Sequence, residues 1–477
     1  MGFLGGMIHM KKDLSESSSD KNLGEKDIRV VYSGELIIVE NYESWCEGKV
    51  FMTDDTEVVL NGSYTEWIFV KQMNGVFAFA FYDEKLGVLH LFRDRIGVKP
   101  LFYTRQGDTI FFASEIETLL ANSGVKPVLD RKGLNEVFSI GPAKTYGCGV
   151  FKGIDEVLPG HLLSYTGAEM KNSCYWKLES KVHEDNYEQT VEKTAFLLEN
   201  AVKNQMISGV PVCTFLSGGL DSSLVSAICA RELRKEGKRL HTFSFDFVGN
   251  DKNFQANMFQ PSQDRPYVEK MVTFLDSEHH YLECDSRTQA DYLYASIDAK
   301  GLPAMADVDS SLLYFCSQVA KEYKVALTGE CADEIFGGYP WFHKKECLEA
   351  HTFPWTMDLA PRGANAFRRI FKALKMDAYV QETGANPAAE TPRLAGESAL
   401  ETRRREISGL NQKKWFMRTL LDRMGGTSAR YGLSARVPFA DYRIVEYLWN
   451  VPWEMQARQR GVRRGLLREV GRGIAPG

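Results

Sequence analysis

Two segments of the chain concentrate residue types that bind anions and metal ions. The first, TFLSGGLDSS at 214–223, places two glycines, three serines and an aspartate between an apolar run and a stretch of helical periodicity. Glycines permit positive φ angles and close approach of a ligand, and the free amides of a helix start attract phosphate. Asp221 fits beside a polyphosphate only if Mg²⁺ bridges the two. The alternative interpretation is a serine-capped helix after a glycine turn.

The second segment, VALTGECADEIFGGY at 325–339, is again an apolar run broken by glycine and followed by acids. Glu330, Asp333 and Glu334 are three and four residues apart, so we expect them to share part of one helix face. Acids at a helix start can also simply complement the helix dipole. Combined with the first segment, they predict a metal site formed by Asp221 and Asp333, with Glu330 free for proton transfer.

A parallel sheet is the element that would bring these two segments together. From Pro211 onward apolar strands such as PVCTFL, LHTFSFDF and KVALTG alternate with helical segments, which is typical of crossover units. Ligands bind such sheets at the carboxyl ends of the strands, where both segments are expected. The pattern also predicts a helix at 186–206 and a mainly helical carboxyl-terminal region.

The region before this alternation has a different pattern. Between Val30 and Trp176, short apolar stretches such as GVFAFAFYD and VLHLFRD are separated by Asn, Gly, Asp and Pro, which favours antiparallel β-structure. Before it lies a polar, serine-rich stretch without periodicity. We therefore predict a flexible lead-in at 1–28, a β-rich domain at 29–185 and an α/β domain at 186–477.

The composition of the chain argues against several classes of binding partner. The chain has 477 residues and a formal net charge of −5, which argues against broad binding to nucleic acid or anionic lipid. No apolar run approaches the roughly 18 residues that span a membrane, and the amino-terminal residues lack the pattern of a secretory signal. The nine cysteines occur singly, so we expect reduced thiols in a cytoplasmic protein.

Further motifs resemble a known family. SGGLDSS followed by TGECADEIFGGY is similar to the synthetase half of glutamine-dependent asparagine synthetases, and MADVDSS, PWFH and ARVPFADYRIVEYLWNVPWE extend the likeness. The stretch from Val30 to Trp176 resembles a class II glutamine amidotransferase domain, with YSGEL, DDTEVVL, NGVFAFAFYD, RDRIGVKPLFY and FFASEI in the family's order. The resemblance implies an α+β amidotransferase domain of the Ntn-type, β-rich sandwich fold. An α/β PP-loop ATP-pyrophosphatase domain, related to the adenine nucleotide alpha hydrolases, would follow it.

This resemblance implies a reaction and roles for residues. The aspartate side chain would attack the α-phosphorus of ATP to give β-aspartyl-AMP and pyrophosphate, and ammonia would then displace AMP. Asp221 and Asp333 would hold Mg²⁺, and Glu330 would orient ammonia and take its proton. The implied ATP-binding residues are Phe215, Leu216, Ser217, Gly218, Gly219, Asp221, Ser222, Ser223, Phe245, Thr328, Gly329 and Arg464.

The sequence departs from the family pattern in the amidotransferase half. Relatives begin Met-Cys-Gly and use the cysteine as nucleophile, whereas here Gly2 follows the methionine and the first cysteine is Cys46. In the family's Asn-Gly-Glu motif the asparagine is replaced by Ser33, while the Gly and Glu remain. The expected remnant of a glutamine site is Ser33, Gly34, Glu35 and Asp55. We therefore expect an incomplete amidotransferase domain without glutaminase activity.

The synthetase half also departs from the pattern. Glycines in DRMGGTSARYG stand where relatives usually have Asp-Arg, and the chain ends before a lysine segment of the family, so we expect a shortened domain. We expect Arg464 to lie near the phosphates. The alternative is that Arg464 lies on a helix face exposed to solvent.

The expected function is ATP-dependent conversion of aspartate to asparagine, with ammonia rather than glutamine as the nitrogen source. The expected partners are small molecules, namely aspartate, ATP and ammonia or glutamine. A homodimer is the oligomeric state that we consider possible from the family. Two alternatives stay open: another adenylating relative, such as a β-lactam synthetase or a peptide-cyclising homologue, and a catalytically impaired binding or scaffold protein.

Overall fold

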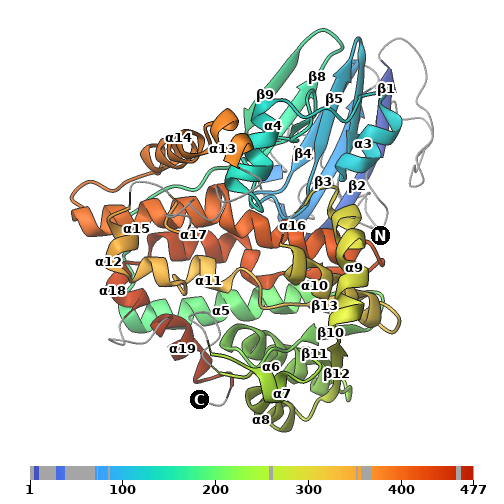
Figure 1. The fold of residues 1–477 in the computed structure, drawn as a ribbon. Helices are drawn as coiled ribbons and strands as arrows, with labels where there is room; N and C mark the ends of the chain where they lie inside the picture. Colours follow the sequence, from blue (N-terminus) through green and yellow to red (C-terminus); the bar gives the residue numbers. More distant parts are fainter. Residues whose placement is uncertain are drawn as a thin grey trace, which may run out of the picture. The chain divides into compact units, whose positions relative to one another are not determined.

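The computed structural model describes residues 5–9, 28–37, 70–71, 73–83, 86–256, 262–303, 305–350, 353–355, 368–457 and 464–475. The chain forms two compact units, an amino-terminal unit, Met1–Leu178, and a carboxyl-terminal unit, Glu179–Gly477 (Figure 1). The domain boundary that we predicted after residue 185 lies near this division and stays a prediction.

The amino-terminal unit consists mainly of antiparallel strands. Its elements are β1 Gly5–His9, β2 Ile28–Ile37, β3 Asn74–Asp83, β4 Val88–Arg93, β5 Phe102–Gln106, β6 Thr109–Ala113, α3 Ile116–Asn122, α4 Arg131–Asn135, η2 Glu136–Ile140, β7 Asp155–Glu156, β8 His161–Tyr165 and β9 Met170–Cys174. They form one sheet in the order β2-β3-β4-β8-β9 and a second in the order β1-β6-β5-β7, with all pairs antiparallel.

The two sheets share one hydrophobic core, which makes this unit a β-sandwich. Side chains of β3, β4 and β8 from the first sheet pack with side chains of β6 from the second, and the cluster comprises Ala78, Ala80, Leu89, Leu91, Leu101, Ile110, Phe112, Val157, Leu163 and Tyr165. The expected β-rich sandwich is thus confirmed. The expected flexible lead-in at 1–28 is wrong for Gly5–His9, which pairs with β6 as strand β1, because its backbone groups complete that edge of the sheet.

A buried ion pair fixes the end of β4 in this unit. Arg93 pairs with Glu156 at 2.8 Å, and both side chains are fully buried. The guanidinium also donates to the backbone carbonyls of Gly97, Lys99 and Val157 at 2.8–2.9 Å, so all its nitrogens have partners. Such complete hydrogen bonding is the condition under which a buried charge is tolerated.

The carboxyl-terminal unit alternates strands and helices and then becomes helical. Its elements are α5 Tyr187–Met206, β10 Val212–Phe215, α6 Leu220–Lys235, β11 His241–Phe247, α7 Asn250–Asn253, α8 Arg265–Leu275, β12 Glu278–Cys284, α9 Ser286–Lys300, α10 Ala306–Val319, β13 Val325–Leu327, α11 Ala332–Ile335, η3 Pro340–Phe342, α12 Lys345–Leu348, α13 Arg368–Leu374, α14 Met376–Ala389, α15 Ala399–Gly409, η6 Leu410–Lys414, α16 Phe416–Ala429, β14 Ser434–Arg436, η7 Pro438–Ala440, α17 Tyr442–Asn450, α18 Trp453–Gln456 and α19 Gly465–Gly471.

The strands of this unit form a single parallel sheet in the order β12-β11-β10-β13-β14. From β10 the chain passes to β11 on one side, and β13 then pairs on the other side of β10. The order therefore reverses between β10 and β13, and the crevice at the carboxyl ends of these two strands is where open α/β sheets bind ligands.

Helices cover both faces of this sheet. Cys213 packs against Phe315 and Cys316 of α10 on one face, whereas the next residue, Thr214, bonds to Ser226 of α6 at 2.8 Å on the other. The alternation follows from the two-residue period of a strand.

Three further features bear on the expectations from sequence. The expected parallel α/β sheet is confirmed, but its edge strand β14 lies within a region that we had expected to be mainly helical. Among the described residues, seven cysteines besides Cys148 form no disulfide bond, and no helix is long and apolar enough to cross a membrane.

Candidate active site

The first glycine-rich segment forms the turn between β10 and α6. Gly218 has a φ of 75°, and a Cβ there would lie 2.8 Å from the Val268 nitrogen of α8, so only glycine fits this turn. The Ser217 amide donates to Ser222 Oγ at 3.1 Å, and the two serine hydroxyls bond to each other at 3.0 Å. These bonds fold the turn upon itself, so two of the three serine hydroxyls that we expected to face a ligand are used within the turn.

The second segment follows β13 and lies directly against the first. A Cβ on Gly329 would lie 2.6 Å from the Ser222 nitrogen, which shows how closely the two backbones approach. Thr328 is buried and its amide donates to the Arg436 carbonyl at 2.9 Å, which ties the turn to β14. The reversal of strand order thus places the two predicted segments in contact.

Glu330 does not share a helix face with the other two acids, contrary to our expectation. The helix α11 begins only at Ala332, and Cys331 before it has a φ of 77°. The left-handed residue turns the chain between Glu330 and the helix, so sequence spacing does not give their relative directions.

A cation from the chain itself joins the two predicted metal ligands. Arg464 Nη1 contacts both carboxylate oxygens of Asp221 and lies 3.1 Å from Asp333 Oδ1. The side chains of Arg464 and Asp221 are each 17% exposed, so the alternative of a solvated helix face is wrong for Arg464. Burial raises the pKa of Asp221, and the nearby Asp333 acts in the same direction, whereas the guanidinium opposes the shift.

Glu330 has its own basic partner on α16. Arg423 Nη2 donates to Glu330 Oε1 at 3.0 Å, and the Arg423 side chain is 14% exposed. Glu330 also lines the pocket described next.

Asp221, Asp333 and Glu330 line one pocket of about 250 Å³. Its wall contains Phe215, Ser217, Asp221, Ser222, Thr328, Gly329, Glu330 and Asp333 from the predicted set, together with Cys331, Ala332, Glu334, Tyr339, Leu420 and Met424. The wall combines carboxylates with the apolar side chains of Leu420 and Met424 from α16, as in pockets that hold a partly apolar ligand through a few polar groups.

Other predicted residues lie beside the pocket rather than on its wall. Leu216 and Ser223 are buried, and Gly218 and Gly219 shape the turn without lining the pocket. Phe245 packs edge-to-face on Phe315 of α10, with ring centroids 5.9 Å apart. Phe215 packs on the same ring at 4.6 Å and does reach the pocket.

Several wall residues were not identified from the sequence. Arg423, which pairs with Glu330 but does not line the pocket, was also missed; it is one of two arginines in α16 and lies next to Met424. Tyr339 was a second, and its hydroxyl donates to Glu334 Oε1 at 2.5 Å. Glu334 is buried, and this burial raises its pKa to about 8.

The expected glutamine-site remnant is described only in part. Ser33, Gly34 and Glu35 lie in β2, where they pair with Ala78, Phe77 and Val76. Asp55 and Cys46 lie outside the described residues. The remnant therefore stays a prediction.

The residues around Arg464 fit a magnesium ion. Asp221 and Asp333 reach a common cation, and carboxylate oxygens are the ligands that Mg²⁺ prefers. The amides of the first turn of α6 have no partners within the helix, so phosphate oxygens beside the ion would find donors there.

Comparison with known proteins agrees with this architecture. A family model described as a glutamine amidotransferase domain matches residues 19–176, and one described as asparagine synthase matches residues 193–477. Glutamine-hydrolyzing asparagine synthetase 3 of Bacillus subtilis is 45% identical over 94% of this chain and 73% of its own length. Putative glutamine-hydrolyzing asparagine synthetase 2 of Methanocaldococcus jannaschii is 32% identical over 67% of this chain and 60% of its own length. Amidase chry2 of Gibberella zeae is 26% identical over 95% of this chain and 75% of its own length. The chain therefore belongs to the glutamine-hydrolysing asparagine synthetase family of carbon–nitrogen ligases.

Proposed function

We propose that the carboxyl-terminal unit converts aspartate to asparagine through β-aspartyl-AMP, with release of AMP and pyrophosphate. The observation that carries this proposal is the meeting of two turns at the carboxyl ends of β10 and β13. There Asp221, Asp333 and Glu330 line one pocket. We expect the reaction in the cytoplasm, because the cysteines occur singly in the sequence rather than in the pattern of a disulfide framework, and a homodimer stays a prediction.

The adenylation step depends on positioning. The amides of the turn at 217–219 and of the first turn of α6 would bind the phosphate oxygens of ATP, and Phe215 would contact its nucleoside. Mg²⁺ held by Asp221 and Asp333 would neutralise charge on the pyrophosphate that leaves. The aspartate carboxylate then attacks the α-phosphorus while the α–β bridging oxygen departs, a step governed by alignment and electrostatics.

The amidation step assigns a role to Glu330. Ammonia attacks the β-carbonyl carbon of the adenylate, AMP leaves, and the new nitrogen must lose a proton. Glu330 has one oxygen held by Arg423, and we infer that the other accepts this proton. Leu420 and Met424 would keep this part of the pocket dry, so that ammonia rather than water reaches the carbonyl.

Exchange of labelled pyrophosphate into ATP tests the first step independently of the second. We expect exchange with Mg²⁺ and aspartate, no exchange with other amino acids, and asparagine formation when ammonium is added. Glutamine in place of ammonium tests the nitrogen source, and we expect ammonium to serve.

The variant Glu330→Gln separates the two steps. Exchange should persist within a few-fold, while asparagine formation should fall by about 10²-fold or more, the scale of lost general-base catalysis. Glu283→Gln is the matched control, because Glu283 is an exposed acid of β12 that does not line the pocket. Absence of aspartate-dependent exchange in the wild-type chain would refute the proposal.

A further inference from the structure

A second cluster of side chains that could bind a metal ion lies at the amino-terminal ends of the parallel strands, whereas the pocket lies at their carboxyl ends. His241 is the first residue of β11, and Glu278 is the first residue of β12. In the parallel register His241 lies beside Glu278, and Phe243 lies beside His280. Since alternate residues of a strand share a face, all four side chains project from the same side of the sheet. The pocket, in contrast, lies at the carboxyl ends of β10 and β13.

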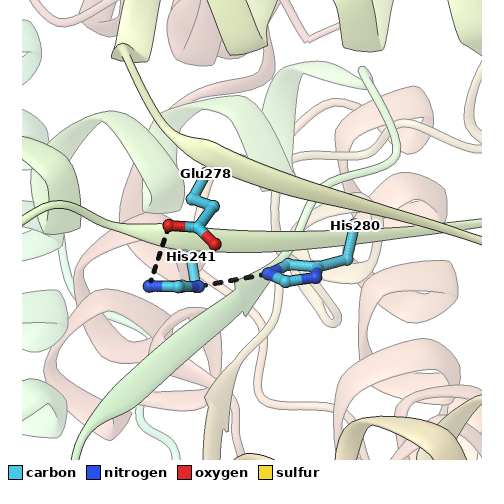
Figure 2. A group of neighbouring side chains, drawn as sticks. All are labelled: His241, Glu278 and His280. Atoms are coloured by element: carbon cyan, nitrogen blue, oxygen red, sulfur yellow. Dashed lines mark hydrogen bonds and ion pairs between the residues drawn. The ribbon is translucent and has the colours of Figure 1, made fainter.

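In this cluster the His241 ring lies between the other two side chains, with one ring nitrogen toward His280 and the other toward Glu278 (Figure 2). His241 Nδ1 lies 3.1 Å from His280 Nε2, and His241 Nε2 lies 3.6 Å from a carboxylate oxygen of Glu278. One ligand atom from each of the three residues lies within 4.8 Å of the others. In the part of the chain that the structure describes, this is the one such group of histidine, cysteine and acidic side chains.

Aromatic packing holds both imidazoles in place. The His280 ring stacks on buried Phe243 with centroids 4.4 Å apart and an angle of 10°. The His241 ring packs against Tyr323 at 5.3 Å. The facing nitrogens are therefore positioned by the core, which is the preorganisation that a metal site requires.

We propose that His241, Glu278 and His280 bind a divalent transition-metal ion, with Zn²⁺ as the ion that fits best. In tetrahedral zinc sites with Zn–N bonds near 2.0–2.1 Å, neighbouring ligand nitrogens lie about 3.3 Å apart, close to the separation seen here. Glu278 is 55% exposed and has the rotational freedom to complete the third bond. Two imidazoles and a carboxylate, with water in the fourth position, form a donor set that zinc commonly takes.

This site differs chemically from the pocket between β10 and β13. Imidazole nitrogen favours zinc, copper and nickel, whereas the oxygen ligands Asp221 and Asp333 favour magnesium. β12 is an edge strand of the sheet, so an ion at this site would join the amino-terminal ends of β11 and β12. The role that follows is to hold the edge strand in register, and it does not depend on the proposed reaction.

Competition with a chromophoric chelator tests the site directly. The metal-stripped chain is titrated with Zn²⁺ in excess Mg²⁺, which occupies oxygen-only sites. We expect one zinc site, whose affinity Glu278→Gln lowers by about tenfold or more and His280→Gln abolishes. Loss of a residue that binds the metal directly should lower metal affinity at least as much as loss of a residue that only hydrogen-bonds to such a ligand. Glu283→Gln is the control, since Glu283 is an exposed acid of the same strand on the opposite face.

Two readouts keep the outcome independent of folding defects. Co²⁺ should give the intense visible absorption of a tetrahedral site in the wild-type chain and in Glu283→Gln, but not in Glu278→Gln. Zinc should raise the melting temperature of the wild-type chain more than that of Glu278→Gln. Equal zinc affinity in the wild-type chain and Glu278→Gln, or octahedral cobalt spectra in both, would overturn the proposal and leave a hydrogen-bonded histidine pair.

Discussion

The closest approach between the two turns of the pocket gives the sharpest prediction, the effect of Gly329→Ala. The added methyl carbon would lie 2.6 Å from the Ser222 nitrogen and 3.0 Å from the Asp221 Cβ. Ordinary contacts begin at 3.4 Å, so the two backbones must separate by 0.8 Å, the difference between 3.4 and 2.6 Å. Both atoms belong to the start of α6, which cannot yield as a flexible side chain would.

This displacement should affect activity more than stability. Overpacking of this size costs about 1–3 kcal/mol of folding free energy. Asp221 and Glu330 are carried by the two turns that separate, and misplacement of reacting groups by about 1 Å costs roughly 10²-fold in rate. We therefore expect aspartate-dependent pyrophosphate exchange to fall by about 10²-fold while thermal unfolding remains cooperative.

The matched control is Gly425→Ala in α16. A Cβ there meets no atom within 4 Å, and alanine favours a helix over glycine by about 0.5–1 kcal/mol. This variant should keep full exchange activity and melt slightly higher than the wild-type chain. Exchange by Gly329→Ala within three-fold of the wild-type rate would show that the turns do not need their observed contact.

Three further predictions concern single side chains. Arg423→Met should lower asparagine formation by about 10–100-fold with little effect on pyrophosphate exchange, because Glu330 loses a charge-assisted hydrogen bond; equal losses in both assays would contradict this. Arg93→Met should destabilise the amino-terminal unit by about 3–5 kcal/mol in urea unfolding, since Glu156 keeps a buried charge without its partner, and an unchanged midpoint would count against it. Burial lowers the pKa of His90 to about 4, below its usual 6.5, so the unfolded chain binds the proton first and stability is lost as pH falls from about 6.5 to 4. His90→Gln should remove up to roughly 3 kcal/mol of this acid sensitivity, and identical pH profiles would refute the assignment.

Local sequence rules were sufficient for the sheet and its two turns. The apolar run of β10, the glycines after it and the periodicity of α6 are short-range signals, and the parallel order then places β13 beside β10. The same rules missed β14, because Ser434–Arg436 is too short to show alternation and is defined only by its pairing with β13. They also misplaced Glu330, since the positive φ of Cys331 is not signalled by its residue type.

The pairing of charges could not be predicted from spacing. Arg423 is 93 residues from Glu330, and Arg464 is 243 residues from Asp221, so no helical or strand period relates them. The sequence predicted that Asp221 and Asp333 share a magnesium ion, on the argument that Mg²⁺ bridges Asp221 and a polyphosphate, and this ion stays a prediction. The fold supplies a guanidinium there, from the start of α19. Magnesium bound by both acids would therefore compete with Arg464 for the same oxygens, and the displaced guanidinium would remain within reach of any phosphate that these acids help to bind.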